Sequence, residues 1–428
     1  MKLQSLFSVV SLIALTLSCS GDSGRQKVTL LDTPTELKTE VTETSASLTW
    51  KDNCSSEKGY YVFLDSDAAP LASLPANSQT YTFTGLNPGS SYRLGVQAYG
   101  ENNAFSQLVW TQVGLPEADP NPIEAISFNW TEVAGTPAGI KLYSTSDKLN
   151  GRNFHAWYAI ADPKEVNVRV LYPGNGGKAT IDKQASDSGN CLALINGGIF
   201  GTAPIGFAML DDTQTPWRFI EADNWAVDKQ YWGPDNKLHT VSRGLFGVDH
   251  NGTPGVFWSF TPSYGTVKVY EKPIPSVAGE AVQKEADDNF PCPPANWEPY
   301  NAITCGPALL QGGRCPITDK KTSKGFWETN YEMWADDIYG VDQLADRTAV
   351  GYTADGKVIL FICDGRIDAS KGATTLEMAR IMKGLGCQGA LNLDGGGSTG
   401  MWISGLGHIN DLTGGNRAVM TTIGFFSK

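Results

Sequence analysis

The sequence has few features that would mark a nucleic-acid-binding or zinc-binding protein. It contains four histidines, and no two of its eight cysteines have the CxxC spacing of a structural zinc site. Its 33 lysines and arginines are outnumbered by 45 aspartates and glutamates, which gives a formal net charge of −12. This charge argues against nucleic acid or anionic membrane surfaces as partners through bulk attraction. Any phosphate group must therefore be recognised locally, by an arginine or by clustered backbone N–H groups.

Long apolar runs are also absent. The apolar run at residues 6–17 has about a dozen residues, too few for a helix that crosses a hydrocarbon core of roughly 30 Å, and no other segment approaches that length. It follows Lys2 and precedes small residues at 18–21, which is the pattern of an export signal. We therefore predict a leader at residues 1–19, followed by a tether at 20–27.

Cys19 lies close behind the apolar run, an arrangement that resembles the lipoprotein box of bacteria. We expect Cys19 to become the acylated first residue of the mature protein, with plain cleavage and secretion as the alternative. Acylation would make this an exported, lipid-anchored protein of the bacterial cell envelope, on its periplasmic or outer-surface face. In such a compartment oxidised pairs are plausible among the six cysteines of the C-terminal part, Cys191, Cys292, Cys305, Cys315, Cys363 and Cys387.

Residues 28–114 consist of short alternating segments separated by turn residues, and they show no helical periodicity. This pattern predicts an antiparallel β-sandwich, with strands at 46–50, 59–64 and 91–99. The stretch from Leu86 through Pro88-Gly89 to Tyr92 resembles a fibronectin type III domain, in which the tyrosine packs at a corner after a turn. The resemblance implies a spacer or adhesion module without chemistry of its own.

Residues 115–124 contain three prolines among acidic residues, which predicts an extended linker. The second domain is expected at 125–428, with strands such as 191–195 and 256–260 and few helices. The predicted fold class is thus multidomain, an all-β fibronectin-like sandwich followed by an α+β domain with a mixed sheet.

One strand, helix, strand unit is well marked in this second domain. Residues 358–363 form a continuous apolar run, typical of a strand buried on both faces. Thr374 and Glu377 have the spacing of a capping box, and the apolar residues Met378, Ile381, Met382 and Leu385 then recur with helical periodicity. A second strand is predicted at 389–393.

Two carboxylates follow these strands. If the strands are parallel in one sheet, Asp364 and Asp394 both lie at carboxyl ends, the edge where parallel sheets commonly bind ligands. The same geometry places Cys363 and Cys387 at opposite ends of the unit, about five residues apart at roughly 3.3 Å each, which is too far for a disulfide.

Four parts of the second domain fit one known pattern in their order and spacing. They are 196–200, 347–351, the stretch from 364–365 through 376–379 to 391–398, and Arg417. Together they resemble the phosphodiester glycosidase family. With the predicted leader, the resemblance implies an exported hydrolase that cleaves the glycosidic bond of a sugar-1-phosphodiester, similar to a GlcNAc-α-phosphodiester, to give free sugar and a phosphomonoester. The implied partner is a carbohydrate phosphodiester, and no cofactor is required, although clustered aspartates could hold a calcium ion.

Three carboxylates are candidates for catalysis. Asp394 ends a buried strand, and the glycines after it allow close backbone approach, although an Asp-Gly turn is the alternative. Asp364 precedes a glycine in the same way and has the same alternative. Glu377 is included by the family resemblance, but its capping-box position already explains it.

The departing phosphate is a good leaving group, so one arginine that neutralises its charge could replace strong acid catalysis. Arg347 and Arg417 are the candidates, with exposed ion pairs as their alternative role. The glycine-rich turn could offer a concave set of N–H groups to an anion, and Asn196 could bind a sugar hydroxyl or the phosphate. The predicted binding set is Arg347, Arg417, Asn196, Gly197, Gly395, Gly396, Gly397, Ser398 and Thr399.

Three other functions are alternatives to this one. Residues 396–400 match the G-x-S-x-G pattern of serine hydrolases, but a strand is predicted after Ser398 where a helix is needed, and His408 precedes Asp411. Cleavage at phosphorus would make the protein a phosphodiesterase. A non-catalytic, surface glycan-binding lipoprotein would keep the fold without turnover.

Overall fold

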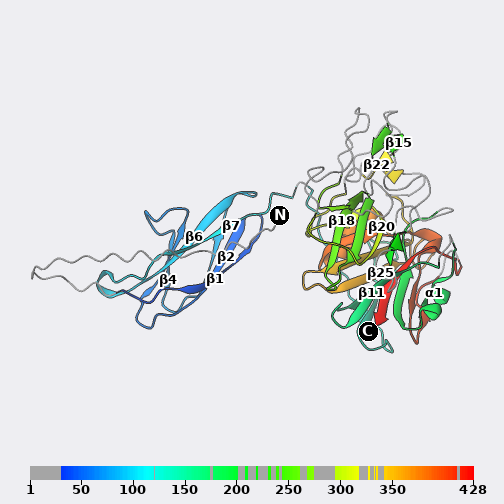
Figure 1. Ribbon diagram of the computed structural model, residues 1–428, viewed down its shortest axis with the longest axis horizontal. Coiled ribbons are helices and arrows are strands. Elements are labelled where there is room, and N and C mark those ends of the chain that lie inside the picture. The colour runs from blue at the N-terminus through cyan, green and yellow to red at the C-terminus, as the bar shows by residue number, and fades with distance from the viewer. Residues whose placement is uncertain are drawn as a thin grey trace, which may run out of the picture. The chain divides into compact units, whose positions relative to one another are not determined.

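The computed structural model describes residues 30–119, 121–173, 177–200, 243–260, 268–273, 295–317, 342–411 and 415–428, with short stretches at 208–210, 218–219, 230–232, 238–240, 326–327, 332 and 334–335. The chain divides into two compact units, Met1–Asp119 and Pro120–Lys428. Strands dominate both units (Figure 1). Within the described ranges no helix is long and apolar enough to span a membrane. The leader, the tether and Cys19 lie outside the described residues.

The first unit is the predicted antiparallel β-sandwich. One sheet has the order β1 (Thr35–Val41), β2 (Ser45–Lys51) and β5 (Thr80–Thr84), and the other β4 (Ala72–Pro75), β3 (Gly59–Leu64), β6 (Ser91–Tyr99) and β7 (Val109–Gly114). Alternate residues of these strands, among them Leu48, Trp50, Val62 and Leu94, form one core. The hydroxyl of Tyr92 accepts a 2.8 Å hydrogen bond from the N–H of Asn87, which forms the expected tyrosine corner.

The second unit contains a seven-stranded sheet. Its order is β21 (Ala308–Leu310), β26 (Cys387–Asn392), β24 (Arg347–Thr353), β25 (Val358–Cys363), β10 (Ala156–Ala161), β9 (Ile140–Thr145) and β8 (Thr131–Glu132). β25 and β26 both pair antiparallel with β24, so they are parallel to each other, as the sequence predicted, but β24 lies between them.

The strand pairings correct one expectation. Every pair of named strands among the described residues is antiparallel, so the sheet is not mixed. The physical reason is the short turn at 354–357, which joins β24 and β25 into a hairpin and inserts β24 between the two parallel strands.

Two further sheets complete the second unit. One has the order β11 (Val166–Leu171), β29 (Thr422–Ser427), β12 (Cys191–Asn196), β27 (Met401–Ile403) and β28 (Gly407–His408). The other has the order β14 (Arg218–Phe219), β13 (Ala208–Leu210), β20 (Asn301–Cys305), β17 (Arg243–Val248), β18 (Pro254–Phe260) and β19 (Lys268–Tyr270). Two small hairpins pair β15 (Gln230–Trp232) with β16 (Leu238–Thr240) and β22 (Phe326–Trp327) with β23 (Trp334–Ala335).

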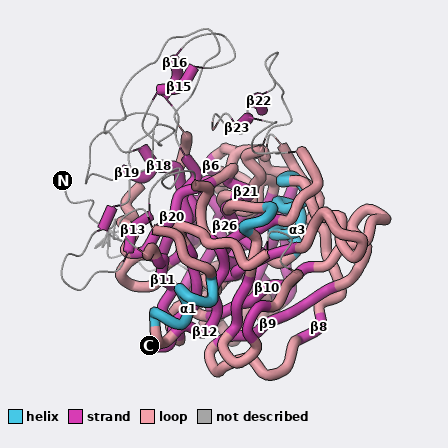
Figure 2. The backbone as a smooth tube through the Cα atoms, turned by 90° about the vertical axis from the view of Figure 1, so that its right-hand side faces the viewer, coloured by secondary structure: helices cyan, strands magenta, loops and turns pink. Residues whose placement is uncertain are grey.

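The described residues include two α-helices, which lie apart around the strands (Figure 2). α3 (Thr375–Gly384) has the predicted capping box of Thr374 and Glu377, and its apolar face packs on one side of the seven-stranded sheet. The other side of that sheet forms the main core with β11, β12, β17 and β29. α1 (Ile181–Ser188) packs on the five-stranded sheet, beside Leu194 and Phe426.

Four of the six cysteines expected to form oxidised pairs are free thiols. Cys191, Cys305, Cys363 and Cys387 are buried and free, as is Cys54 in the first unit, and Cys292 lies outside the described residues. Cys363 and Cys387 are thus unpaired with each other, as predicted from their positions on β25 and β26. Burial raises the pKa of the Cys191 and Cys305 thiols to about 12, so both are protonated and inert at neutral pH.

Candidate functional site

Three strand ends meet at one edge of the second unit. β25 ends at Cys363 and leads to Asp364, and β26 ends at Asn392 and leads through Leu393 to Asp394. β12, from the five-stranded sheet, ends at Asn196. The turn after Asp394 contains a short 3-10 helix, η2 (Gly396–Ser398).

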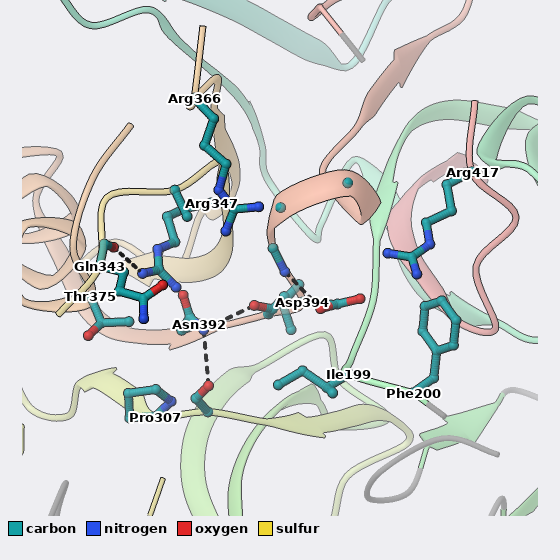
Figure 3. Close-up of a pocket in the computed structure, with 16 residues that line it drawn as sticks. Ile199, Phe200, Pro307, Gln343, Arg347, Arg366, Thr375, Asn392, Asp394 and Arg417 are labelled. Carbon is teal, nitrogen blue, oxygen red and sulfur yellow. Dashed lines mark hydrogen bonds between the residues drawn. The ribbon is translucent and has the colours of Figure 1, made fainter. Parts of the chain in front are cut away.

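A cavity of ≈ 340 Å³ opens beside this turn. Asp394 and three arginines, Arg347, Arg366 and Arg417, line it, together with Phe200 and other residues. Asp394 is the one carboxylate on the wall within the described part of the chain. Arg366 and Arg347 lie on one side of Asp394, and Arg417 and Phe200 lie on the other (Figure 3).

The backbone of Asp394 is held by the end of β12. The N–H of Asp394 donates to the carbonyl of Gly197 at 3.0 Å, and the side-chain amide of Asn196 donates to the carbonyl of Asp394 at 2.7 Å. Asn196 is completely buried, and its Oδ1 accepts from Thr348 Oγ1 and from the N–H of Gly400. Neither Asn196 nor Gly197 lines the cavity, so both act by fixing the position of Asp394.

The carboxyl group of Asp394 is half-buried, and its pKa is raised to about 6. Burial is the main cause, because it disfavours the charged form. Hydrogen bonds from Ser398 and from the N–H of Gly395 act in the opposite direction, as does the positive charge of Arg417. The group can therefore change protonation state near neutral pH.

The glycine-rich turn does not present the concave set of N–H groups that the sequence suggested. The N–H groups of Gly395, Gly396, Ser398, Thr399 and Gly400 donate to protein oxygens that hold the turn and Asp394 in place. Among residues 395–400, Gly397 is the one whose N–H has no such acceptor in the described structure. The positive charge on the cavity wall therefore comes from the arginines.

Arg347 is almost fully buried. Its Nε donates to the carbonyl of Ala373 at 2.9 Å and its Nη2 to the carbonyl of Gln343 at 2.6 Å, and these two hydrogen bonds fix the wall of the cavity. The pKa of Arg347 is lowered to about 10, mainly by burial, and the nearby positive charge of Arg366 acts in the same direction.

Arg366 and Arg417 are exposed and have no carboxylate ion-pair partner in the described residues. Arg417 Nη1 donates to Ser398 Oγ at 3.3 Å, and its guanidinium lies 5.7 Å from the centre of the Phe200 ring. Arg366 has a left-handed backbone, φ 60°, and its guanidinium lies over Gly396. A Cβ atom at residue 396 would come within 3.1 Å of Arg366 Nη1, so the glycine makes room for the arginine.

Asp364 does not line the cavity. It is completely buried, and its Oδ1 accepts from Asn410 Nδ2 at 3.3 Å. Its Oδ2 lies 3.8 Å from His155 Nδ1 and has no hydrogen-bond partner among the residues that the structure describes. Burial raises the pKa of Asp364 to about 7, and the charges of Asp411 and Asp346 add to the effect. Burial also lowers the pKa of His155.

Glu377 also lies outside the cavity wall. Its Oε2 accepts from the N–H of Thr374 in the capping box, and its Oε1 accepts from Arg152 Nη2 at 2.6 Å and from Asn150 Nδ2 at 2.7 Å. These contacts give Glu377 a complete structural role.

The structure thus brings together Asp394, Arg347, Arg417 and residues 395–397 on one wall, with Ser398 and Thr399 buried behind them. Sequence reasoning missed Arg366 and Phe200. Arg366 directly follows Asp364-Gly365 at the end of a predicted strand, and this position is the one feature of the sequence that could have identified it as a site residue. Among the described residues, no group of three or more His, Cys, Asp or Glu side chains is placed to hold a metal ion.

Two family models match this chain. Residues 189–426 match the model described as phosphodiester glycosidase, and residues 32–109 match the fibronectin type III domain. The first match covers the end of β12, the Asp394 turn and all three arginines.

Among curated proteins, the chain is 38% identical over 65 residues to N-acetylglucosamine-1-phosphodiester alpha-N-acetylglucosaminidase of Mus musculus, a match that covers 15% of this chain. It is 37% identical over 78 residues, 18% of this chain, to the SPbeta prophage-derived uncharacterized protein YomE of Bacillus subtilis. The matched part of the chain spans 12% of the length of each relative.

Among solved structures, the zebrafish N-acetylglucosamine-1-phosphodiester alpha-N-acetylglucosaminidase catalytic domain is similar with a TM-score of 0.43 and 20% identity, over 71% of this chain and 89% of that one. A hypothetical protein from Synechocystis is similar with a TM-score of 0.44 and 17% identity, over 92% of this chain and 76% of that one.

Proposed function

Because the chain belongs to the phosphodiester glycosidase family, we propose that it hydrolyses the glycosidic bond of a sugar-1-phosphodiester and releases the free sugar and a phosphomonoester. The observation that carries the proposal is the composition of the cavity wall, where one carboxylate lies between arginines on both sides. An anionic substrate fits this excess of positive charge.

A single carboxylate on the wall, among the residues that the structure describes, fits a phosphate leaving group. Ordinary glycosidases use two carboxylates, one of which protonates the departing oxygen. A phosphate departs without that proton, provided that its developing charge is stabilised. Arg366 and Arg417 can supply this stabilisation, because neither is neutralised by a carboxylate partner in the described residues.

Asp394 is assigned the role of base. In its ionised form it takes a proton from a water molecule, whose oxygen bonds to the anomeric carbon while the bond from that carbon to the phosphate oxygen breaks. The phosphomonoester leaves with the bond electrons, and the proton remains on Asp394 until it passes to solvent. A pKa near 6 leaves Asp394 mostly ionised at neutral pH while keeping it basic enough to accept a proton.

The test is incubation with a panel of sugar phosphodiesters that includes a GlcNAc-α-phosphodiester, in water labelled with heavy oxygen. The proposal expects free sugar that carries the label. Label in the phosphate would instead identify a phosphodiesterase that cleaves at phosphorus. Release of nothing from the whole panel would overturn the proposal, and ligand binding without turnover would identify a glycan-binding protein.

Export and lipid anchoring are a second part of the proposal, supported by the sequence pattern of residues 1–19. Expression of the full chain in a bacterial host with labelled palmitate tests it. The parent is expected to carry the label and to fractionate with membranes, whereas Cys19→Ala is expected to lose both properties. A parent chain that is secreted without label would leave plain cleavage as the explanation.

A further inference from the structure

The segment that carries Arg417 is joined to the start of α1. Ala179 and Val419 exchange two backbone hydrogen bonds, of 3.1 and 2.9 Å. Ala179 comes two residues before the first residue of α1, and Val419 comes two residues after Arg417. The two segments, far apart in sequence, are therefore joined by one isolated antiparallel bridge, two residues from Arg417 on the cavity wall.

Gln184, a buried residue of α1, stabilises this bridge. The Gln184 amide Nε2 donates to the carbonyls of Ala179 and Val419, both at 3.1 Å. Its Oε1 accepts a 3.0 Å hydrogen bond from the hydroxyl of Thr422, the first residue of β29. Gln184 is buried, so these bonds are protected from water and are costly to break.

Asp182 extends the connection to the residue next to Arg417. Its Oδ2 accepts a hydrogen bond from the side-chain amide of Asn416 and lies 2.7 Å from His408 Nε2. The N–H of Arg417 donates to the carbonyl of Gly415 at 2.8 Å, so residues 415–417 form a tight turn. An acidic residue in the first turn of a helix is favoured by the helix dipole, but the dipole does not require contact with Asn416.

We propose that Asp182 is a positioning residue for Arg417. By holding Asn416, it fixes the turn from which Arg417 reaches Ser398 and Phe200 at the cavity wall. An exposed arginine loses side-chain freedom when it binds an anion, and a fixed backbone reduces that loss. The inference rests on the proposed function in one respect, which is that Arg417 binds the phosphate of the substrate.

The experiment measures the Kd of inorganic phosphate by calorimetry, and kcat and KM on a sugar phosphodiester, for the full chain. Asp182→Ala is expected to weaken phosphate binding by about five- to tenfold and to lower kcat/KM on the sugar phosphodiester by a similar factor, because Arg417 contacts the phosphate in both measurements. Asp182→Asn keeps an oxygen that can accept from Asn416 and is expected to recover most of the affinity. Asp187→Ala is the matched control, because Asp187 lies at the other end of α1 and, among the described residues, pairs with Lys183 alone.

A double variant gives the sharpest readout. In an Arg417→Ala background, Asp182→Ala should have no further effect on phosphate affinity, because the positioned group is gone. Multiplicative losses, an unchanged Kd in Asp182→Ala, an equal loss in Asp187→Ala, or a parent that binds no phosphate would each overturn the inference. A parent that binds phosphate but releases no sugar would count against the proposed function alone, and the phosphate measurements would still decide the role of Asp182.

Discussion

The buried amide of Asn196 donates a 2.7 Å hydrogen bond to the backbone carbonyl of Asp394, and so connects the end of β12 to the end of the β26 segment. Because the two strands belong to different sheets, this bond fixes the candidate catalytic carboxylate at the junction of the sheets. The glycine next to Asn196 is required by the same junction, since a Cβ atom at Gly197 would lie 2.3 Å from Thr421 Oγ1.

Asp394→Asn should abolish turnover without unfolding the protein. The amide cannot take a proton, so we expect kcat to fall by a factor on the order of a thousand. In the parent, kcat should rise with pH through about 6, because the ionised carboxylate is the active form. Steady-state kinetics across this pH range check both points, with Asp368→Asn, an exposed residue paired with Lys371, as the control. Unchanged kcat in Asp394→Asn would exclude Asp394 as the base.

Arg366→Asn and Arg347→Ala should separate binding from stability. Asparagine tolerates the left-handed backbone of residue 366, so Arg366→Asn should keep the parent's stability and lower kcat/KM by about ten- to a hundredfold. Arg347→Ala removes a buried side chain that satisfies two carbonyls, and we expect its free energy of unfolding to fall by about 3 kcal/mol. Denaturant unfolding and steady-state kinetics test the two variants. An Arg366→Asn variant that loses stability but not activity, together with an Arg347→Ala variant that keeps its stability, would contradict these roles.

The stability of the second unit should decrease as pH rises through neutrality, because of Asp364. Its pKa is raised from 3.8 to about 7 in the folded state, so the folded protein holds the proton more tightly than the unfolded chain. The stabilisation is complete below the unfolded pKa and is lost as pH rises through the folded pKa, a change on the order of 4 kcal/mol. Asp394 contributes in the same direction. Urea unfolding at about pH 5 and about pH 8 should show this decline in the parent and a smaller one in Asp364→Asn. Equal declines in the two proteins would exclude Asp364 as the source.

Glu377 is expected to affect stability and not turnover. Glu377→Ala removes the capping-box acceptor and leaves Arg152 without its carboxylate, which should lower the free energy of unfolding by about 3 kcal/mol. Glu377→Gln keeps an oxygen for the Thr374 N–H and should lose less. Chemical denaturation, together with kcat under conditions where both variants are folded, tests this. A folded Glu377→Gln variant without turnover would restore the catalytic role that the family resemblance suggested.

The sequence by itself determined the local elements and the edge at which the site lies. The apolar run at 358–363, the capping box at Thr374 and the strand before Asp394 depend on periodicity and spacing within about ten residues, and the structure has all three. The parallel direction of β25 and β26 follows from the helix between them, so the shared edge of Asp364 and Asp394 was also predictable.

Only the tertiary structure decided which of these groups face the cavity. The Asp364 carboxylate contacts His155 and Asn410. The N–H groups of the glycine turn donate hydrogen bonds to Asp346, to Asn196 and to oxygens of the turn itself. Such outcomes depend on contacts between residues far apart in the chain. They are set by the register of strands from different sheets, and no local pattern contains that information. The same holds for Arg366. It lies over Gly396 because the segments that follow β25 and β26 meet at one edge of the sheet.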